Sequence, residues 1–290
     1  MIIRKLNGTI EIINGREEKA AYQTAKGNNG KNYVKKETVA DCYLNIPDEG
    51  NSKTGKHVIN LNFPIEYTCD HRCECYKDGI CYAESGCYLF SDNQRLYSEN
   101  YNFYKNSTAE EFVAALQLAI NKTRYKFFRY FTCGDIINYK FIDCMVKLAE
   151  DNPGVKFWTY TKKYTLVNIW IDSHKEYHQN VIKTGRILPN LTIIFSHWLN
   201  SDGSYFTMDN KWDLPTSEFI PYGKEELAEK ATFICPCSDP SVNVTCENCE
   251  YGCYNLCKGQ SQALKEHSTK QTKQRDAEIK AAKKALAKKQ

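Results

Sequence analysis

The sequence predicts an α/β protein whose central part is a partial (β/α) barrel. From residue 57 onward, strand-like and helix-like segments alternate, which is typical of βαβ units and a parallel sheet. Each expected strand is a short run of β-branched and aromatic residues that ends in small or polar residues. In such folds the carboxyl ends of the strands carry the functional site. The expected strands are His57–Phe63, Lys126–Thr132, Val155–Thr161 and Leu191–Ser196.

Helices are expected between these strands. Residues 107–111 (STAEE) have the capping-box pattern, in which a hydroxyl precedes a glutamate three residues later, so a helix should begin there. A second, amphipathic helix is expected over about residues 138–150, and a third from about residue 165 to residue 174. Two other stretches are expected to lack regular structure: a tyrosine-rich connector at residues 97–104 and irregular surface structure at residues 198–230.

Composition divides the 290 residues into four expected segments: a β-rich preface at 1–56, the partial barrel at 57–230, a cysteine-rich metal-binding segment at 231–259 and a basic helical tail at 260–290. The net charge of +4 is concentrated in the tail, which holds nine Lys and Arg against three Asp and Glu. Such a tail could contact nucleic-acid phosphates, although a charge run is more often a solvated face. The sequence has neither a run of about 18 apolar residues nor a signal-peptide pattern, so we expect a cytoplasmic protein without a membrane segment.

The densest cluster of cysteines follows the first expected strand. The stretch Thr68–Cys87 reads TCDHRCECYKDGICYAESGC. In a reducing cytosol, clustered cysteines indicate metal ligands rather than disulfides. Three thiolates would leave one iron of a [4Fe–4S] cluster open, whereas four would make a closed zinc site, and the spacing alone leaves both alternatives open. The three cluster ligands would be Cys69, Cys73 and either Cys75 or Cys81.

A second cluster, between residues 235 and 257, contains a Cys-x2-Cys pair with further cysteines on both sides. This pattern indicates a metal site, either a tetrahedral zinc or an auxiliary iron–sulfur cluster, and does not separate the two. The cysteines outside both clusters, Cys42, Cys133 and Cys144, are expected to be ordinary buried residues. The expected ligands of the second site are Cys235, Cys246, Cys249 and Cys253.

Several of these motifs resemble those of a phage and mobile-element family known as gene product 88. That family has a Thr-Cys pair, a middle cysteine and a Cys-Tyr-Ala after its first strand, similar to Thr68-Cys69, Cys73 and Cys81-Tyr82-Ala83. Its Ser-Gly-Asp turn is similar to Cys133-Gly134-Asp135, and its Phe-Trp-x-Tyr-Thr-Lys strand matches residues 157–162 (FWTYTK). The resemblance spans about residues 57–257. More broadly, a cysteine loop followed by Gly-Asp resembles the radical S-adenosylmethionine superfamily.

The broader resemblance implies a fold, a cofactor and a reaction. The fold would be a partial barrel of the radical S-adenosylmethionine type, with a [4Fe–4S] cluster on Cys69, Cys73 and Cys81. The open iron would bind S-adenosylmethionine, whose reductive cleavage requires an electron donor such as flavodoxin or ferredoxin. Asp135 would receive the cofactor's ammonium group; from the residues alone, it caps the following helix equally well. The expected cofactor-binding residues are Tyr82, Gly134, Asp135, Tyr160, Lys162 and Ser196.

Two functions are therefore expected. The first is a radical S-adenosylmethionine-like iron–sulfur enzyme, whose substrate the sequence does not identify. The alternative is a non-catalytic, zinc-stabilised α/β protein that binds nucleic acid through its basic tail. The colour of anaerobically purified protein separates the two, because an iron–sulfur protein is brown and a zinc protein is colourless.

Overall fold

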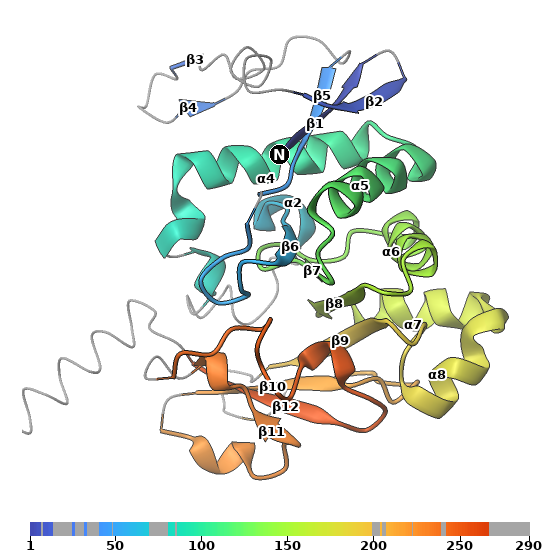
Figure 1. Cartoon of the computed structure of the whole chain (residues 1–290). Coiled ribbons are helices and arrows are strands. Elements are labelled where there is room, and N and C mark those ends of the chain that lie inside the picture. Colours follow the sequence, from blue (N-terminus) through green and yellow to red (C-terminus); the bar gives the residue numbers. More distant parts are fainter. Residues whose placement is uncertain are drawn as a thin grey trace, which may run out of the picture.

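The computed structural model describes residues 1–6, 8–13, 25–26, 32–33, 41–47, 49–69, 81–84, 86–198, 204, 207–221, 223–238 and 242–266 (Figure 1). Its main element is a seven-stranded sheet in the order β11-β12-β10-β9-β8-β7-β6, in which every neighbouring pair is parallel. The strands are β6 (Val58–Leu61), β7 (Phe127–Tyr130), β8 (Lys156–Thr161), β9 (Leu191–His197), β10 (Thr216–Ile220), β11 (Phe233–Ile234) and β12 (Ser261–Lys265).

The sheet is wound in one direction. From β6 to β10, strands that follow one another in the chain are also neighbours in the sheet, as in a (β/α) barrel. Within the described residues the sheet stays open, with β6 and β11 as its edges. The prediction of an α/β fold with a parallel sheet is confirmed, and a closed barrel is not formed by this part of the chain.

Helices cover one face of the sheet (Figure 1). Because strand side chains alternate between faces, every second strand residue, such as Ile59, Phe128 and Ile193, packs with the helices in one apolar core. The helices are α2 (Ile65–Thr68), α4 (Ser91–Lys105), α5 (Ala109–Thr123), α6 (Tyr139–Asp151), α7 (Tyr164–Ser173) and α8 (His178–Thr184). The short 3₁₀ helices are η1 (Tyr82–Glu84), η2 (Gly86–Leu89), η3 (Lys175–Tyr177), η4 (Glu225–Ala228), η5 (Pro236–Ser238) and η6 (Cys253–Asn255).

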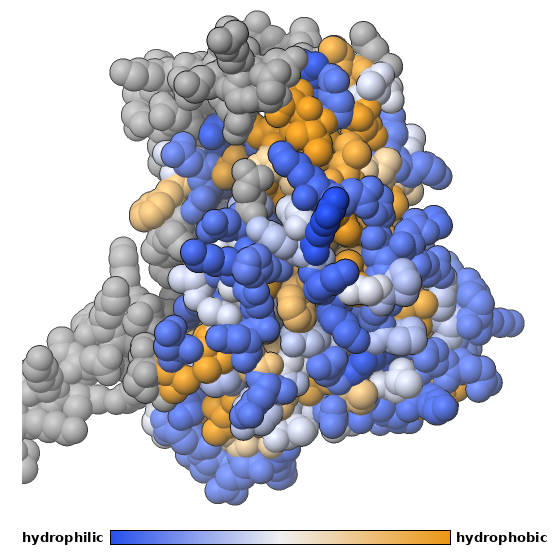
Figure 2. Space-filling view, in the orientation of Figure 1, coloured by the Kyte–Doolittle hydropathy of each residue, from blue (hydrophilic) through white to orange (hydrophobic). Residues whose placement is uncertain are grey.

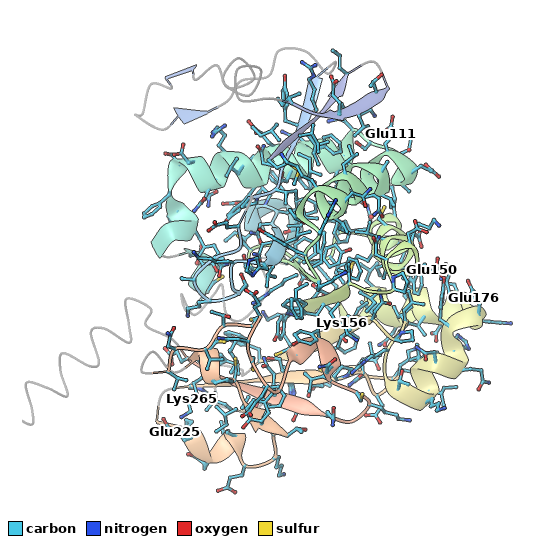
Figure 3. The ribbon with its side chains drawn as sticks, viewed as in Figure 1. Glu111, Glu150, Lys156, Glu176, Glu225 and Lys265 are labelled. Carbon is cyan, nitrogen blue, oxygen red and sulfur yellow. The ribbon has the colours of Figure 1, made fainter. Side chains whose placement is uncertain are left out.

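The predicted helix starts are confirmed by their caps. Thr108 caps α5 through a capping box, in which its hydroxyl accepts from the backbone N–H of Glu111 and the Glu111 carboxylate accepts from the N–H of Thr108 (Figure 3). Asn138 caps α6, with its side chain accepting from the N–H of Phe141. The expected alternative role of Asp135 as the cap of this helix is therefore wrong.

The opposite face of the sheet is covered by the cysteine-rich segment. Val58, Trp158 and Ile194 point away from the helices and pack against Cys253 and Leu256. This docking places the second cysteine cluster on the sheet rather than in a satellite beside it.

The N-terminal residues form a small antiparallel sheet in the order β2-β1-β5, from β1 (Ile2–Leu6), β2 (Thr9–Ile12) and β5 (Asp41–Asn45). The two-residue strands β3 (Ala25–Lys26) and β4 (Asn32–Tyr33) pair with each other. Helix α4 packs on β5, where Asn100 donates to the carbonyl of Asn45 at 3.0 Å. The expectation of a connector at residues 97–104 is wrong, because α4 buries polar Glu99 and Asn100 and so lacks a plainly amphipathic pattern.

Two expectations for the carboxyl-terminal third are also corrected. Residues 216–220, expected to be irregular, form β10, and residues 261–265, expected to begin a basic helix, form β12 between β10 and β11. Both strands bury polar side chains: Gln262 donates to the Ser217 hydroxyl at 2.9 Å. Because buried polar residues take part in both strands, neither strand has the apolar pattern by which a buried strand is recognised in a sequence. Lys265 lies at the end of β12 (Figure 3), and residues 267–290 lie outside the described part of the chain.

The visible surface in Figure 2 is mostly hydrophilic, with hydrophobic residues gathered near the N-terminal sheet. Across the described ranges of the chain, none of the helices combines the length and the hydropathy needed to cross a bilayer.

Candidate functional site

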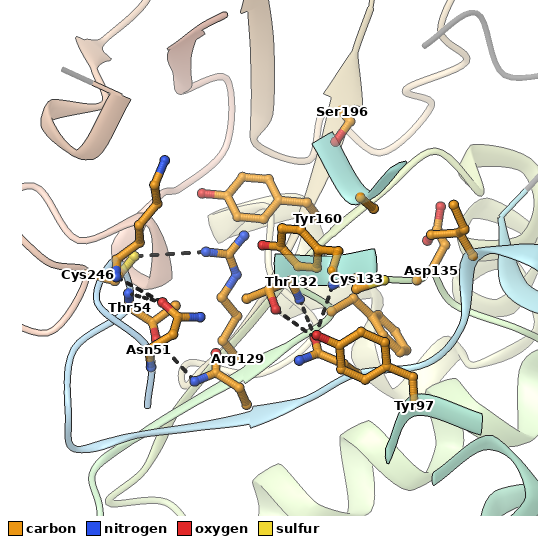
Figure 4. Close-up of a pocket in the computed structure, with 18 of the residues that line it drawn as sticks. Asn51, Thr54, Tyr97, Arg129, Thr132, Cys133, Asp135, Tyr160, Ser196 and Cys246 are labelled. Atoms are coloured by element: carbon orange, nitrogen blue, oxygen red, sulfur yellow. Dashed lines mark hydrogen bonds between the residues drawn. The ribbon is translucent and has the colours of Figure 1, made fainter. Parts of the chain in front are cut away.

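A cavity of about 620 Å³ opens at the carboxyl ends of the parallel strands (Figure 4). Much of its wall comes from residues at or just after the ends of β6 to β10, because the ends of parallel strands meet at one edge of the sheet. The volume is in the range of small-molecule sites. Five of the six residues expected to bind a cofactor line this cavity: Gly134, Asp135, Tyr160, Lys162 and Ser196.

The first cysteine cluster reaches the same cavity. Cys69 and Cys81 both line it, and they pack beside Cys133. Cys133 was expected to be an ordinary buried residue, yet it also lines the cavity. Cys73, Cys75 and the side chain of Tyr82 lie outside the described residues.

Helix α2 fixes where the cysteine loop begins. The hydroxyl of Thr68 donates to the carbonyl of Pro64 at 2.9 Å and accepts from the N–H of Asp135 at 3.1 Å. Gly134 makes this approach possible: its φ is +98°, and a Cβ there would lie 2.8 Å from the carbonyl oxygen of Phe63. These contacts hold Cys69 against the turn that follows β7.

Asp135 joins the ends of two strands. One carboxylate oxygen accepts from the N–H of Ile136 at 2.7 Å and from the hydroxyl of Thr161 at 2.6 Å, and the other accepts from the N–H of Lys162 at 3.1 Å. Burial raises the pKa of Asp135, and the hydrogen bonds from Thr161 and Lys162 oppose that rise. Asp135 thus fastens the turn after β7 to the end of β8.

Asn62 makes a second junction that sequence reasoning missed. Its buried side-chain oxygen accepts from the N–H of Thr132 at 2.8 Å, from the Thr132 hydroxyl at 2.8 Å and from the N–H of Cys133 at 3.0 Å (Figure 4). An asparagine inside the apolar run of residues 57–63 was the available signal, because a polar residue in such a run needs buried partners.

The second cysteine cluster forms part of the same cavity wall. Cys235, Cys237, Cys246 and Cys253 line the large cavity. Together with Cys249, Trp158 and Tyr254, these four also surround a smaller hollow of about 10 Å³. The two clusters that are far apart in the sequence therefore meet at one site.

The loop before β6 positions Cys246. The N–H of Cys246 donates to the carbonyl of Lys53 at 3.0 Å, and the N–H of Glu247 donates to the carbonyl of Thr54 at 2.9 Å. Asn51 stabilises this loop, since its side-chain oxygen accepts from the N–H groups of Lys53 and Thr54. Residues 49–54 were expected only as the end of a preface, and they contribute directly to the cavity wall.

Three thiols of the second cluster influence one another's ionisation. The neighbouring Cys237 thiol lowers the pKa of Cys246 to about 6, and Cys237 itself donates to the carbonyl of Val244 at 3.3 Å. Arg129 also lowers the pKa of Cys246, with Nη1 4.0 Å from the Cys246 sulfur, while its guanidinium lies over the Tyr160 ring (Figure 4). The neighbouring Cys235 and Cys246 thiols, together with burial, raise the pKa of Cys237.

Two buried polar atoms of the cavity wall have no hydrogen-bond partner among the described residues: Oδ1 of Asn60 and Nε1 of Trp198. A polar ligand in the cavity would satisfy such groups. In the described part of the chain, no three His, Cys, Asp or Glu side chains are already arranged around a metal position.

The comparison with protein families settles the relationship that the motifs indicated. A family model described as gene product 88 matches residues 19–212, about two thirds of the 290-residue chain. The chain belongs to the gene product 88 family. For this gene product 88 protein, the match covers the cysteine loop and the strand ends up to β9, and it stops before the second cysteine cluster. No curated protein and no solved structure matches the chain.

Proposed function

We propose that this gene product 88 protein is an iron–sulfur enzyme of the radical S-adenosylmethionine type. The observation that carries the proposal is that one cavity, at the carboxyl ends of parallel strands, is lined by Cys69 and Cys81 and by the Gly134-Asp135 turn. A loop of thiolates at one end of such a cavity suits an iron–sulfur cluster, and the polar strand ends beside it suit a polar cofactor.

The described residues include two of the three cysteines expected to bind the iron–sulfur cluster. Cys69 and Cys81 supply two sulfurs at the cavity wall, and the remaining ligand would be Cys73 in the same loop. Both described ends of that loop, Cys69 and Cys81, line the cavity.

The cavity wall also offers groups that fit S-adenosylmethionine, which supplies radical hydrogen abstraction when it is bound and reduced. The Oδ2 atom of Asp135 accepts one hydrogen bond from the described residues, so it retains capacity for an ammonium group. The Lys162 ammonium lies 4.6 Å from the centre of the Trp198 ring and lines the cavity, where it can face a carboxylate. Trp198 stacks on Phe219 with ring centres 3.9 Å apart, and both rings line this side of the cavity.

The test uses anaerobically reconstituted full-length protein. We expect iron and sulfide to bind with visible absorbance, S-adenosylmethionine to bind in a calorimetric titration, and dithionite to produce 5′-deoxyadenosine. Cys69→Ser should lose the cluster. Cys144→Ser is the matched control, because Cys144 is a buried residue of α6, its thiol donates to the carbonyl of Ala109, and it does not line the cavity.

The proposal fails if the iron-loaded protein neither binds S-adenosylmethionine nor produces 5′-deoxyadenosine. It fails also if Cys69→Ser keeps the iron content of Cys144→Ser. The alternative function, nucleic-acid binding through the tail, depends on residues 267–290, which lie outside the described chain.

A further inference from the structure

Five cysteines surround a single small hollow on the sheet face opposite the helices. The hollow measures about 10 Å³, which is close to the space of one water molecule or one metal ion. It is lined by Trp158, Tyr254 and the thiols of Cys235, Cys237, Cys246, Cys249 and Cys253.

The size of the hollow favours one ion rather than a cluster. A volume of about 10 Å³ holds a single ion or water molecule, whereas a [4Fe–4S] core needs several times that space. Four of the thiols around the hollow would suffice for a tetrahedral ion with metal–sulfur distances of about 2.3 Å.

Cys253 differs from the other four cysteines in its partner, which is a side chain fixed between two strands. The Cys253 thiol donates to Oε1 of Gln262 at 3.1 Å, and the other end of that amide donates to the Ser217 hydroxyl. The Cys237 thiol, in contrast, donates to the backbone carbonyl of Val244 at 3.3 Å. A thiol held through Gln262 by β10 and β12 is better suited to stabilise the wall of the hollow than to ligate an ion.

The indole of Trp158 supplies an independent indication. Trp158 is 1% exposed and lines the hollow, and its Nε1–H has no hydrogen-bond partner in the described part of the chain. Indole N–H is a donor only, and a thiolate ligand is an acceptor, so an occupied site would give this buried donor a partner. Arg129, beside Cys246, would offset part of the negative charge of four thiolates.

We propose that this hollow binds one tetrahedral metal ion of the zinc class through four thiolates, with Cys253 excluded from the ligand set. Among the described residues no three of these side chains already converge on one position, so binding requires rotation of the cysteine side chains. The ion would tie the chain after β11 to the turn that the loop at residues 49–57 holds against the sheet. The ligands are Cys235, Cys237, Cys246 and Cys249.

The experiment compares two single substitutions in full-length protein. Cys237→Ser and Cys253→Ser each remove one thiol from the same hollow, but only Cys237 is a proposed metal ligand. Each protein, and the wild type, is titrated with Co²⁺ under nitrogen, without iron or reductant, and the bound Zn²⁺ is measured by elemental analysis. Four thiolates give an intense thiolate-to-cobalt charge-transfer band, and removal of a ligand weakens it.

We expect one metal ion per chain and a four-thiolate spectrum in the wild type and in Cys253→Ser. Cys237→Ser should show a weaker, three-thiolate spectrum and at least about tenfold lower affinity. Alkylation of the folded wild type, followed by mass spectrometry, gives a second measure that needs no variant: Zn²⁺ should protect the four proposed thiols, and a chelator should expose them.

Three outcomes would overturn the assignment. These are a wild type that binds no Co²⁺ or Zn²⁺, a Cys253→Ser protein that loses the ion, and a Cys237→Ser protein that keeps the four-thiolate spectrum. Because no S-adenosylmethionine or iron enters this experiment, its failure is separate from failure of the proposed enzyme function.

Discussion

Asp135 offers the sharpest test of how the cavity is built. Substitution by alanine removes three hydrogen bonds that connect the turn after β7 to the end of β8. The donors left behind are the N–H groups of Ile136 and Lys162 and the hydroxyl of Thr161. The hydroxyl can rotate to another acceptor, whereas the two N–H groups are fixed by the backbone.

The expected loss of stability follows from these two donors. Each buried N–H left without a partner costs about 1–3 kcal/mol, so the two together cost about 2–6 kcal/mol. Removal of a buried carboxyl relieves part of its desolvation, which reduces the expected net loss to about 2–4 kcal/mol. For a chain of 290 residues that corresponds to a fall in melting temperature on the order of 3–7 °C.

Thermal unfolding followed by circular dichroism measures this fall, and Asp172→Ala is the matched control. Asp172 also accepts hydrogen bonds, from Lys211, but at an exposed position, where such pairs contribute about 0–1 kcal/mol. If Asp135→Ala melts at the temperature of Asp172→Ala, the carboxylate does not connect the two strand ends and the reasoning is refuted.

Three further predictions follow from the same structure. Burial raises the pKa of Asp135, and an acid whose folded pKa is raised loses its stabilising contribution as pH rises above its unfolded value of about 4 and through the folded value. The free energy of unfolding of the wild type relative to Asp135→Asn, measured in urea titrations, should therefore fall as the pH is raised above about 4. A difference that grows with pH would contradict this sign. Asn62→Ala should lower the free energy of unfolding by about 2–4 kcal/mol, because the N–H groups of Thr132 and Cys133 lose their acceptor. Asn121→Ala, on the exposed surface of α5, should leave the free energy of unfolding nearly unchanged in the same urea titrations. Truncation after Glu266 should leave the thermal unfolding transition unchanged. Truncation after Cys257 removes β12 from between β10 and β11 and should abolish the cooperative unfolding transition. Equal melting curves for the two truncated proteins would show that β12 is dispensable.

Local chemistry determined much of the fold. The capping box before α5, the Asn-Pro-Gly end of α6 and the β-branched runs of β6, β8 and β9 lie within a few residues of one another, so their patterns can be recognised without a structure. Because parallel strands share one edge, the same patterns also predicted that Gly134, Asp135 and Lys162 would lie together. The family resemblance, carried by contiguous motifs, is confirmed by the gene product 88 match.

Long-range contacts determined the rest. Helix α4 and strands β10 and β12 escaped prediction because their buried polar residues, such as Asn100, Ser217 and Gln262, are satisfied by partners far away in the sequence. From the sequence, the second cysteine cluster was expected to form a separate metal-binding segment. Only the packing of Cys253 and Leu256 against Trp158 places it on the sheet, where Cys235 and Cys246 line the same cavity as Cys69. Spacing along a chain specifies which thiols are near one another in sequence, whereas the fold of the intervening 150 or so residues decides which thiols share a site.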